Sequence, residues 1–262
     1  MPSFDSARRR LRLSDGHVAA LGYLANGEDV PGELGGAVAE LETAGLADPP
    51  GELNPLAEAL VEALGDPLLV AHIEVTGEHG QTIHGIVAGR EIVFAHEGWP
   101  GVDESEYVPV EPSTLVWSLA RSVGLISRPV TAAGVSEITT TMGTVDAVFE
   151  ALGSSGATSV DEAKKHASAA LGAVAEPARS ALVDVITALN SSWRITTTWA
   201  AGAEVRCIAV WDCGPYGYWH RELPAEPIRE GEVGPESTLR IVPVTAARLW
   251  ELLGDLLPDV LG

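Results

Sequence analysis

The stretches "VPVEPSTLVWSLARSVGL" (Val108–Leu125) and "VPVTAARLWELLGDLLP" (Val242–Pro258) decide the fold, because one chain carries nearly the same pattern twice. Each begins with strand-like alternation, turns at a bend, and continues with apolar residues at helical spacing. We interpret them as two copies of one element, a last strand followed by a closing helix. The aligned pairs are Val108 with Val242, Pro109 with Pro243, Val110 with Val244, Leu115 with Leu249, and Leu119 with Leu253.

Outward from these copies, both halves of the chain predict the same order of elements. Before the first copy we expect a short strand at 9–13, helices at 15–25, 33–43 and 55–65, then strands at 68–76, 81–88, 91–96 and 106–110. Before the second we expect helices at 144–152, 159–171 and 177–189, then strands at 193–200, 203–211, 216–222 and 239–244. This order predicts an internally duplicated α+β fold in which residues 1–130 and 131–262 pack about a pseudo-twofold axis and share one sheet or one core.

The composition argues against membranes and nucleic acid as partners. The chain has 262 residues, 46% apolar and 20% charged, which is ordinary for a globular protein. No stretch approaches ~18 uninterrupted apolar residues, and the basic N-terminal run lacks the apolar block of a secretory signal, so we expect a cytoplasmic protein. The net charge of −21 repels phosphates and anionic lipids, and it serves either solubility or attraction to a basic partner.

No catalytic, cofactor or metal motif is found. Phosphate-binding, dinucleotide-binding and nucleophile-elbow patterns are absent. His72, His84 and His96 lie on or near neighbouring strands, but no single element holds ligands at a metal-binding spacing, so sheet-face histidines are favoured over a zinc site. Cys207 and Cys213 are expected to be reduced, buried thiols. We therefore predict a non-enzyme without cofactor or metal.

Aromatic residues gather in one part of the second half. Trp193 and Trp199 share one face of an expected strand and are predicted to belong to the core. Tyr216, Tyr218 and Trp219 lie among glycines and a proline in an expected turn. Exposed aromatics on a turn suit a protein-binding hot spot, and burial in the core is the alternative.

Polar side chains alternate with apolar ones along the expected strands and define a second face of the sheet. Without a covering helix, this mixed face would be a broad docking surface, and a merely solvated face is the alternative. The residues assigned to it are His72, Glu74, His84, Ile86, Arg194, Thr196, Thr198, Arg206 and Ile208.

Four segments in order resemble the EspG family, the cytosolic chaperones of type VII (ESX) secretion in actinobacteria. The early segments are "RLRLSDGHVAALGYLANGEDVPGEL" and "AVAELETAGLADPPGELNPLAEALVEALGDPLLVAHIEV". The late segments are "CIAVWDCGPYGYWHRELP" and "LRIVPVTAARLWELLGDLL". The match covers nearly the whole chain and is weakest from about Val130 to Ala175. The resemblance implies a quasi-twofold fold with a central antiparallel sheet and flanking helical bundles, in agreement with the duplication.

The resemblance also implies a function. The family binds PE–PPE heterodimers, or related helical-hairpin substrates, keeps them soluble and directs them to secretion, and it has no catalytic residues. Binding through the central sheet, an early hairpin and the C-terminal helices implies contact residues here. They are His72, Glu74, Gly77, Glu78, His79, Arg194, Thr196, Arg206, Ile208 and Leu249. A weak homodimer is left open.

Two other classes of function compete with this one. A strongly acidic protein of this size suits an immunity protein that neutralises a basic toxin. A metal-dependent hydrolase that uses His72, His84 and His96 is the third hypothesis.

Overall fold

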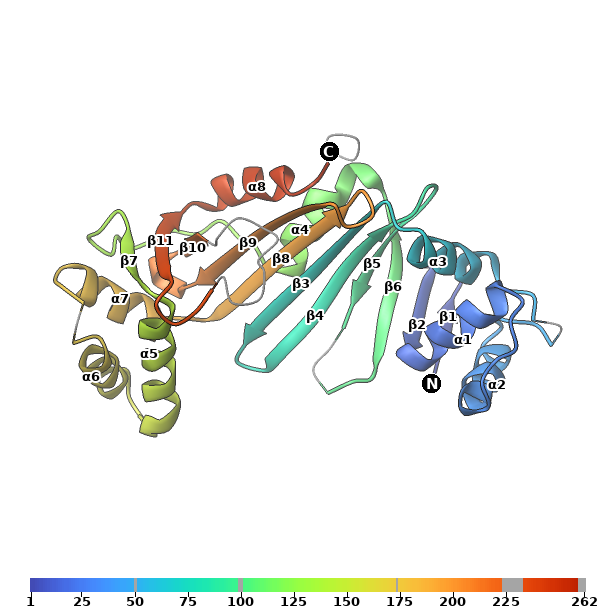
Figure 1. Cartoon of the computed structure of the whole chain (residues 1–262), viewed down its shortest axis with the longest axis horizontal. Helices are drawn as coiled ribbons and strands as arrows, with labels where there is room; N and C mark the ends of the chain where they lie inside the picture. The colour runs from blue at the N-terminus through green and yellow to red at the C-terminus, as the bar shows by residue number, and fades with distance from the viewer. Residues whose placement is uncertain (50, 99–100, 173, 223–232, 259–262) are drawn as a thin grey trace.

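An antiparallel sheet of 11 strands runs through the residues described by the computed structural model, which are 1–49, 51–98, 101–172, 174–222 and 233–258 (Figure 1). The strands lie in the order β1-β2-β6-β5-β4-β3-β8-β9-β10-β11-β7. In the first half they are β1 Ser3–Asp5, β2 Arg10–Ser14, β3 Leu69–Gly77, β4 Gly80–Ala88, β5 Val93–Glu97 and β6 Glu104–Val110. In the second half they are β7 Ile138–Thr141, β8 Ser191–Trp199, β9 Glu204–Asp212, β10 Tyr218–Glu222 and β11 Thr238–Val244.

The helices form two bundles and one pair. The first bundle is α1 Asp15–Ala25, α2 Gly35–Thr43 and α3 Pro55–Gly65. The second is α5 Met142–Ser155, α6 Val160–Ala170 and α7 Ala178–Thr187. The pair is α4 Leu115–Ser122 and α8 Ala246–Asp255, which are the closing helices predicted from the repeated stretches. The α+β class and the central antiparallel sheet with helical bundles are therefore confirmed.

The two halves follow the same plan in element order. Strand order is nearly palindromic about β3 and β8, which pair along their full length with Ile73 opposite Ile195 at the centre. Corresponding strands also have equal lengths, with 9 residues in β3 and β8 and 9 in β4 and β9. Gene duplication, and the division into 1–130 and 131–262, stay predictions.

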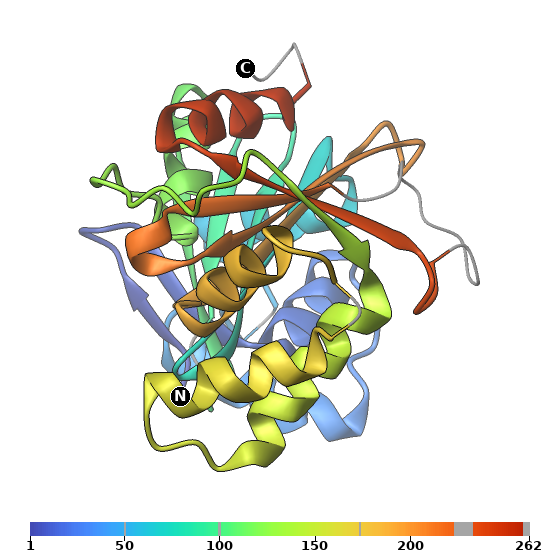
Figure 2. The ribbon, with the colours of Figure 1, turned by 90° about the vertical axis from the view of Figure 1, so that its left-hand side faces the viewer.

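The bundles and the helix pair cover opposite faces of the sheet. α4 and α8 place Leu115, Leu119, Leu249 and Leu253 on the face that carries Ile73. The α1–α3 and α5–α7 bundles pack on the other face at its two ends (Figures 1 and 2). Burial of these four leucines explains why the repeated stretches share them.

Local signals start several helices where the sequence predicts them. Asn54 accepts a hydrogen bond from the Leu56 amide, and Pro55 follows at the first helical position of α3. The Thr245 hydroxyl accepts from the Arg248 amide and caps α8.

Two strands were missing from the sequence prediction. β1 and β7 are short edge strands, and β7 contains the run Thr139, Thr140 and Thr141, which has no apolar alternation. β7 pairs with β11 across almost a hundred residues of sequence, so its strand conformation depends on a distant partner. The Pro/Glu/Gly-rich composition of 224–237 predicts a loop before the last strand, and most of this segment lies outside the described residues.

Candidate functional site: the open face of the sheet

The middle of one sheet face has no helix over it in the described part of the chain. Directly paired residues of an antiparallel ladder share a face, so the register traces this surface from strand to strand. Glu74 pairs with Ile83 on β4 and with Arg194 on β8. At the sheet ends the same face is covered by the bundles, where Phe94 and Trp211 are buried.

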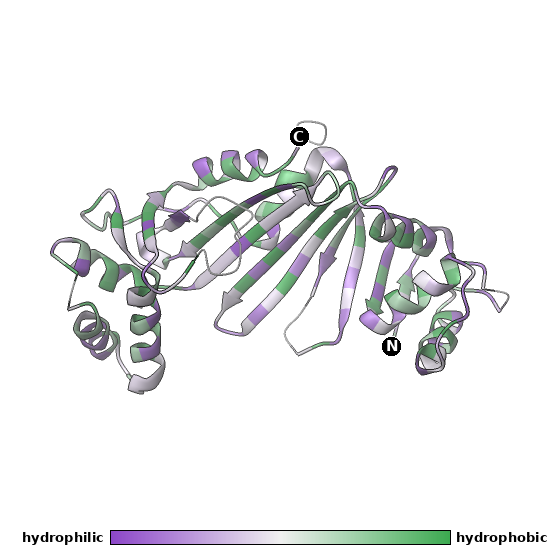
Figure 3. Ribbon diagram, viewed as in Figure 1, coloured by the Kyte–Doolittle hydropathy of each residue, from purple (hydrophilic) through white to green (hydrophobic). Residues whose placement is uncertain are grey.

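We call this central surface the open face. Figure 3 shows hydrophilic and hydrophobic residues alternating along its strands. Val70 and Ile83 are 37% and 45% exposed and supply apolar area among polar neighbours. The open face consists of Val70, His72, Glu74, Thr76, Gln81, Ile83, Ser192, Arg194, Thr196, Thr198, Val205 and Cys207.

The structure brings together five of the predicted sheet-face residues. His72, Glu74, Arg194, Thr196 and Thr198 lie on the open face as expected. The Nε2 atom of His72 lies 3.5 Å from Oε1 of Glu74.

The turn between β3 and β4 is an exposed two-residue tip. It holds Glu78 and His79, and Gly77 pairs with Gly80 across it. Gly80 has φ +96°, a conformation that favours glycine. The hairpin therefore presents its tip next to the open face, where the resemblance implied contact residues.

Four other predicted sheet-face residues lie on the opposite face. Ile73 pairs with His84 and Ile195 pairs with Ile208, so β4 and β9 are shifted by one residue relative to the prediction. A one-residue shift moves every side chain of a strand to the other face. The residues corrected in this way are His84, Ile86, Arg206 and Ile208, of which Ile86 and Ile208 are buried.

Arg206 stabilises the end of a helix. Its Cζ atom lies 4.8 Å from the centroid of the Trp199 ring. Its Nη1 donates to the carbonyl of Leu257 at 3.3 Å and to that of Asp255. A cation at the C-terminal end of α8 satisfies carbonyls that the helix leaves free.

The predicted aromatic hot spot is largely buried. Tyr218 and Trp219 are 3% and 1% exposed, and only Tyr216 of the three is half-buried. Tyr218 and Trp219 are the first two residues of β10, so their side chains point to opposite faces of the sheet. Tyr218 lies in the core beneath α4 and α8, and Trp219 lies in the core beneath the α5–α7 bundle. The prediction that they are exposed is therefore wrong for Tyr218 and Trp219. Leu249, at 0% exposure, is likewise a core residue of α8.

Polar contacts explain this burial. The Tyr218 hydroxyl donates to the Ile126 carbonyl at 3.2 Å, and the Ile126 amide donates to it at 3.0 Å. The Trp219 Nε1 donates to the Tyr216 carbonyl at 3.1 Å. Buried aromatic polar atoms normally find such partners. Trp193 is buried as predicted, and Trp199 is partly buried against the same core.

The histidines do not form a common site. His72 and His96 lie on one face, whereas His84 lies on the other. His96 stacks on Tyr107 with ring centroids 4.9 Å apart. Burial lowers the pKa of both His84 and His96. Among the described residues, no group of three or more His, Cys, Asp or Glu is placed to hold a metal ion.

The two cysteines occupy different environments, and neither forms a disulfide. Cys213 is buried as predicted, and burial raises the pKa of its thiol. Cys207 is half-buried on the open face, contrary to the prediction. No helix in the described ranges is long and apolar enough to cross a bilayer.

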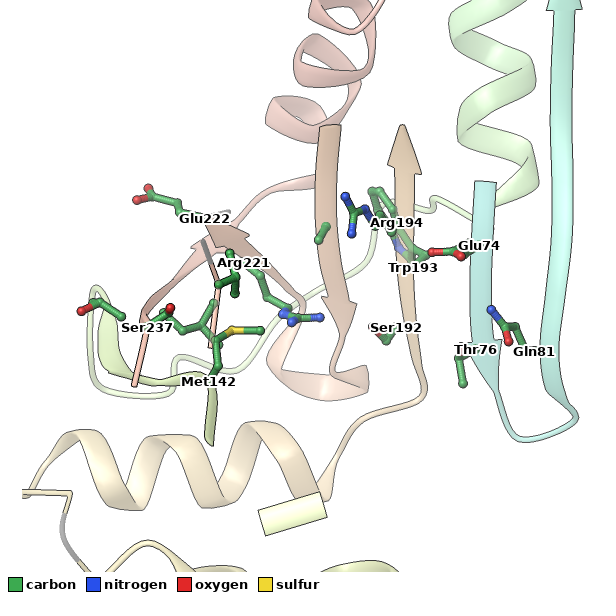
Figure 4. Close-up of a pocket in the computed structure, with 14 residues that line it drawn as sticks. Glu74, Thr76, Gln81, Met142, Ser192, Trp193, Arg194, Arg221, Glu222 and Ser237 are labelled. Carbon is green, nitrogen blue, oxygen red and sulfur yellow. The ribbon is translucent and has the colours of Figure 1, made fainter. Parts of the chain in front are cut away.

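A hollow of about 440 Å³ lies where the open face meets the α5–α7 bundle (Figure 4). Its walls come from β3, β4, β8, β9, β10 and β11, from the start of α5, and from Val233 and Ser237 before β11. Its polar lining includes Glu74, Gln81, Ser192, Arg194 and Arg221. The hollow opens beside the open face. Arg221 is absent from the predicted sheet face because faces were assigned only as far as the expected strand at 203–211.

Comparison with known proteins identifies a shared fold. No family model matches the chain, and no curated protein matches it. A solved structure does match: the Mycobacterium tuberculosis type VII secretion system chaperone EspG5 in complex with the PE25–PPE41 dimer. The similarity has a TM-score of 0.59 at 12% sequence identity and covers 95% of this chain and 97% of that chain. The resemblance predicted from the sequence is thus confirmed at the level of the fold.

Proposed function

We propose that this protein is a cytosolic chaperone of a type VII secretion system that binds a PE–PPE-like helical-hairpin substrate on the open face. The observation that carries the proposal is a whole-chain fold match to a chaperone solved with a PE–PPE dimer. The absence of a catalytic constellation among the described residues is compatible with a binding protein.

The open face has the features of a docking surface. A sheet face that no helix covers leaves apolar side chains such as Val70 and Ile83 in water. The bundles at its ends wall it on two sides (Figure 1). An α-helix with its side chains is about 10–12 Å across, so a helical hairpin can lie between such walls and contact the sheet with its apolar side.

The structure changes which residues we propose for contact. From the sequence-based set we keep His72, Glu74, Gly77, Glu78, His79, Arg194, Thr196 and Thr198, and we keep Tyr216 at the margin of the second bundle. In place of those on the covered face we add Val70, Thr76, Gln81, Ile83 and Cys207. For every residue but Tyr216 the criterion is a place on the open face or at the adjacent hairpin tip.

Co-expression with helical-hairpin proteins encoded nearby tests the proposal. We expect a 1:1 or 1:1:1 complex by affinity capture and size-exclusion chromatography. Ile83→Asp places a charge in the apolar part of the open face and should reduce capture at least ten-fold. Val160→Asp is the matched control, because Val160 is exposed at the start of α6, where an acidic residue is tolerated.

Two results would contradict the proposal. If Ile83→Asp folds and captures its client as well as Val160→Asp does, the open face is not the binding surface. If the only partner recovered is a basic toxin, the protein belongs to the immunity class. The same chromatography of the free protein tests the weak homodimer.

A further inference from the structure

Arg221 is a half-buried cation on the open-face side of β10. It pairs with Ala209 of β9, which in turn pairs with Arg194 of β8, so Arg194 and Arg221 share one face two strands apart. The Cζ atom of Arg221 lies 5.3 Å from the centroid of the Trp211 ring. The side chain extends from β10 toward Ser192 (Figure 4).

No carboxylate among the described residues forms an ion pair with Arg221. Its Nε is buried and has no hydrogen-bond partner. The next residue, Glu222, is bound by Arg240, with Nη1 and Oε1 2.5 Å apart. Burial lowers the pKa of Arg221, the positive charge of Arg194 lowers it further, and Asp146 raises it. A guanidinium desolvated in this way is costly unless an anion joins it.

The surroundings suit a carboxylate from outside. Arg221 and Arg194 both line the hollow of about 440 Å³, together with the hydroxyls of Ser192 and Ser237. The Arg194 Nε donates to Sγ of Cys207 at 3.1 Å, which fixes that side chain over β9. Planar guanidinium groups recognise carboxylates through paired N–H donors.

We infer that Arg221 forms a carboxylate-binding subsite in this hollow, and that it receives an Asp or Glu side chain of the client. The inference rests on the proposed function and adds the chemistry of one contact. On a chain of net charge −21, a half-buried guanidinium that no described carboxylate pairs with selects for an acidic residue at this point of the partner. Glu74 lines the same hollow, and its negative charge repels an incoming carboxylate.

A small dicarboxylate tests the subsite without the client. Glutarate is titrated into the full chain at constant ionic strength, and the arginine Nε–H signals are followed by NMR. The signal absent from Arg221→Met identifies Arg221. We expect it to shift saturably in the wild type, and we expect binding at least ten-fold tighter than in Arg221→Met. Glu74→Gln should tighten binding, and Arg248→Gln, on the exposed surface of α8, should leave it unchanged.

Three results would overturn the inference. One is an Arg221 signal that does not move, or moves in proportion to that of Arg248. Another is an Arg221 signal that shifts, with no glutarate added, when the glutamates at 226, 230 and 232 are changed to glutamine. That result would mean that carboxylates of the chain itself fill the site. The third is an Arg221→Met protein that loses glutarate yet captures the client normally, because the occupant would then be a free carboxylate.

The two proposals can fail separately. If Arg221→Met does not fold, the wild-type signal still decides carboxylate binding. If no hairpin client binds the wild type, the proposed function fails, and the Arg221 signal still reports whether carboxylate binds.

Discussion

Truncation of two isoleucines on neighbouring strands tests which face of the sheet is covered. Ile73 on β3 is fully buried beneath α4 and α8, whereas Ile83 on β4 is 45% exposed on the open face. Ile→Ala removes the same atoms at both positions, so differences in β-propensity largely cancel. Only the packing around each side chain distinguishes the two variants.

The magnitudes follow from burial. Truncation of a fully buried isoleucine costs about 2–5 kcal/mol, because a cavity adds to the lost transfer free energy. Complete burial of an isoleucine stabilises by about 1.5–3 kcal/mol, and Ile83 realises roughly half of that, so Ile83→Ala should cost about 1 kcal/mol. We therefore expect Ile73→Ala to lower the free energy of unfolding by about 1–4 kcal/mol more than Ile83→Ala does.

Urea denaturation followed by tryptophan fluorescence and circular dichroism measures both variants. With a slope of about 3 kcal/mol/M, a loss of 3 kcal/mol moves the midpoint by roughly 1 M, and a loss of 1 kcal/mol by about a third of that. Equal losses, or a greater loss for Ile83→Ala, would refute the register on which the open face depends.

Three further perturbations have defined outcomes. Tyr218→Phe leaves the Ile126 amide and carbonyl without their hydrogen-bond partner and should lower the free energy of unfolding, measured by urea denaturation, by about 1–3 kcal/mol. Tyr23→Phe, at a half-buried residue of α1, is the control. An equal loss in the control would contradict the role of the Tyr218 hydroxyl. Thr245→Ala removes the α8 cap and should cost about 1 kcal/mol, and unchanged amide exchange in α8 would contradict this. Burial lowers the pKa of His84 and His96. As the pH falls, the unfolded chain therefore binds protons at these residues near pH 6.5, at a higher pH than the folded chain does. The free energy of unfolding should then fall as the pH drops below that value. His84→Gln should weaken this fall and His79→Gln, at the exposed hairpin tip, should not; a fall of equal size in both would contradict the assignment.

The sequence predicted the elements better than it predicted their faces. Leu115, Leu119, Leu249 and Leu253 signal the closing helices because their spacing is local and their burial is complete. The Asn54–Pro55 start of α3 is local in the same way. Such features depend on a few neighbouring residues and need no knowledge of the tertiary structure.

The candidate site depended on register, which is less visible in sequence. Alternation along β4 and β9 does not reveal which of two residue sets faces the helices, because Ile83, Ile86 and Ile208 are similar side chains. The two-residue turn after Gly77 pairs even-numbered positions of β3 with odd-numbered positions of β4, and this sets the faces. Turn length was therefore the signal that could have placed His84 correctly.

The most direct test of the central claim is amide hydrogen exchange of the protein with and without its co-expressed hairpin client. The account predicts new protection in peptides covering 70–85 and 192–198, where β3, β4 and β8 form the open face. Exchange in α4 and α8 should stay unchanged. Protection confined to α4 and α8, with the open face exchanging as in the free protein, would contradict it.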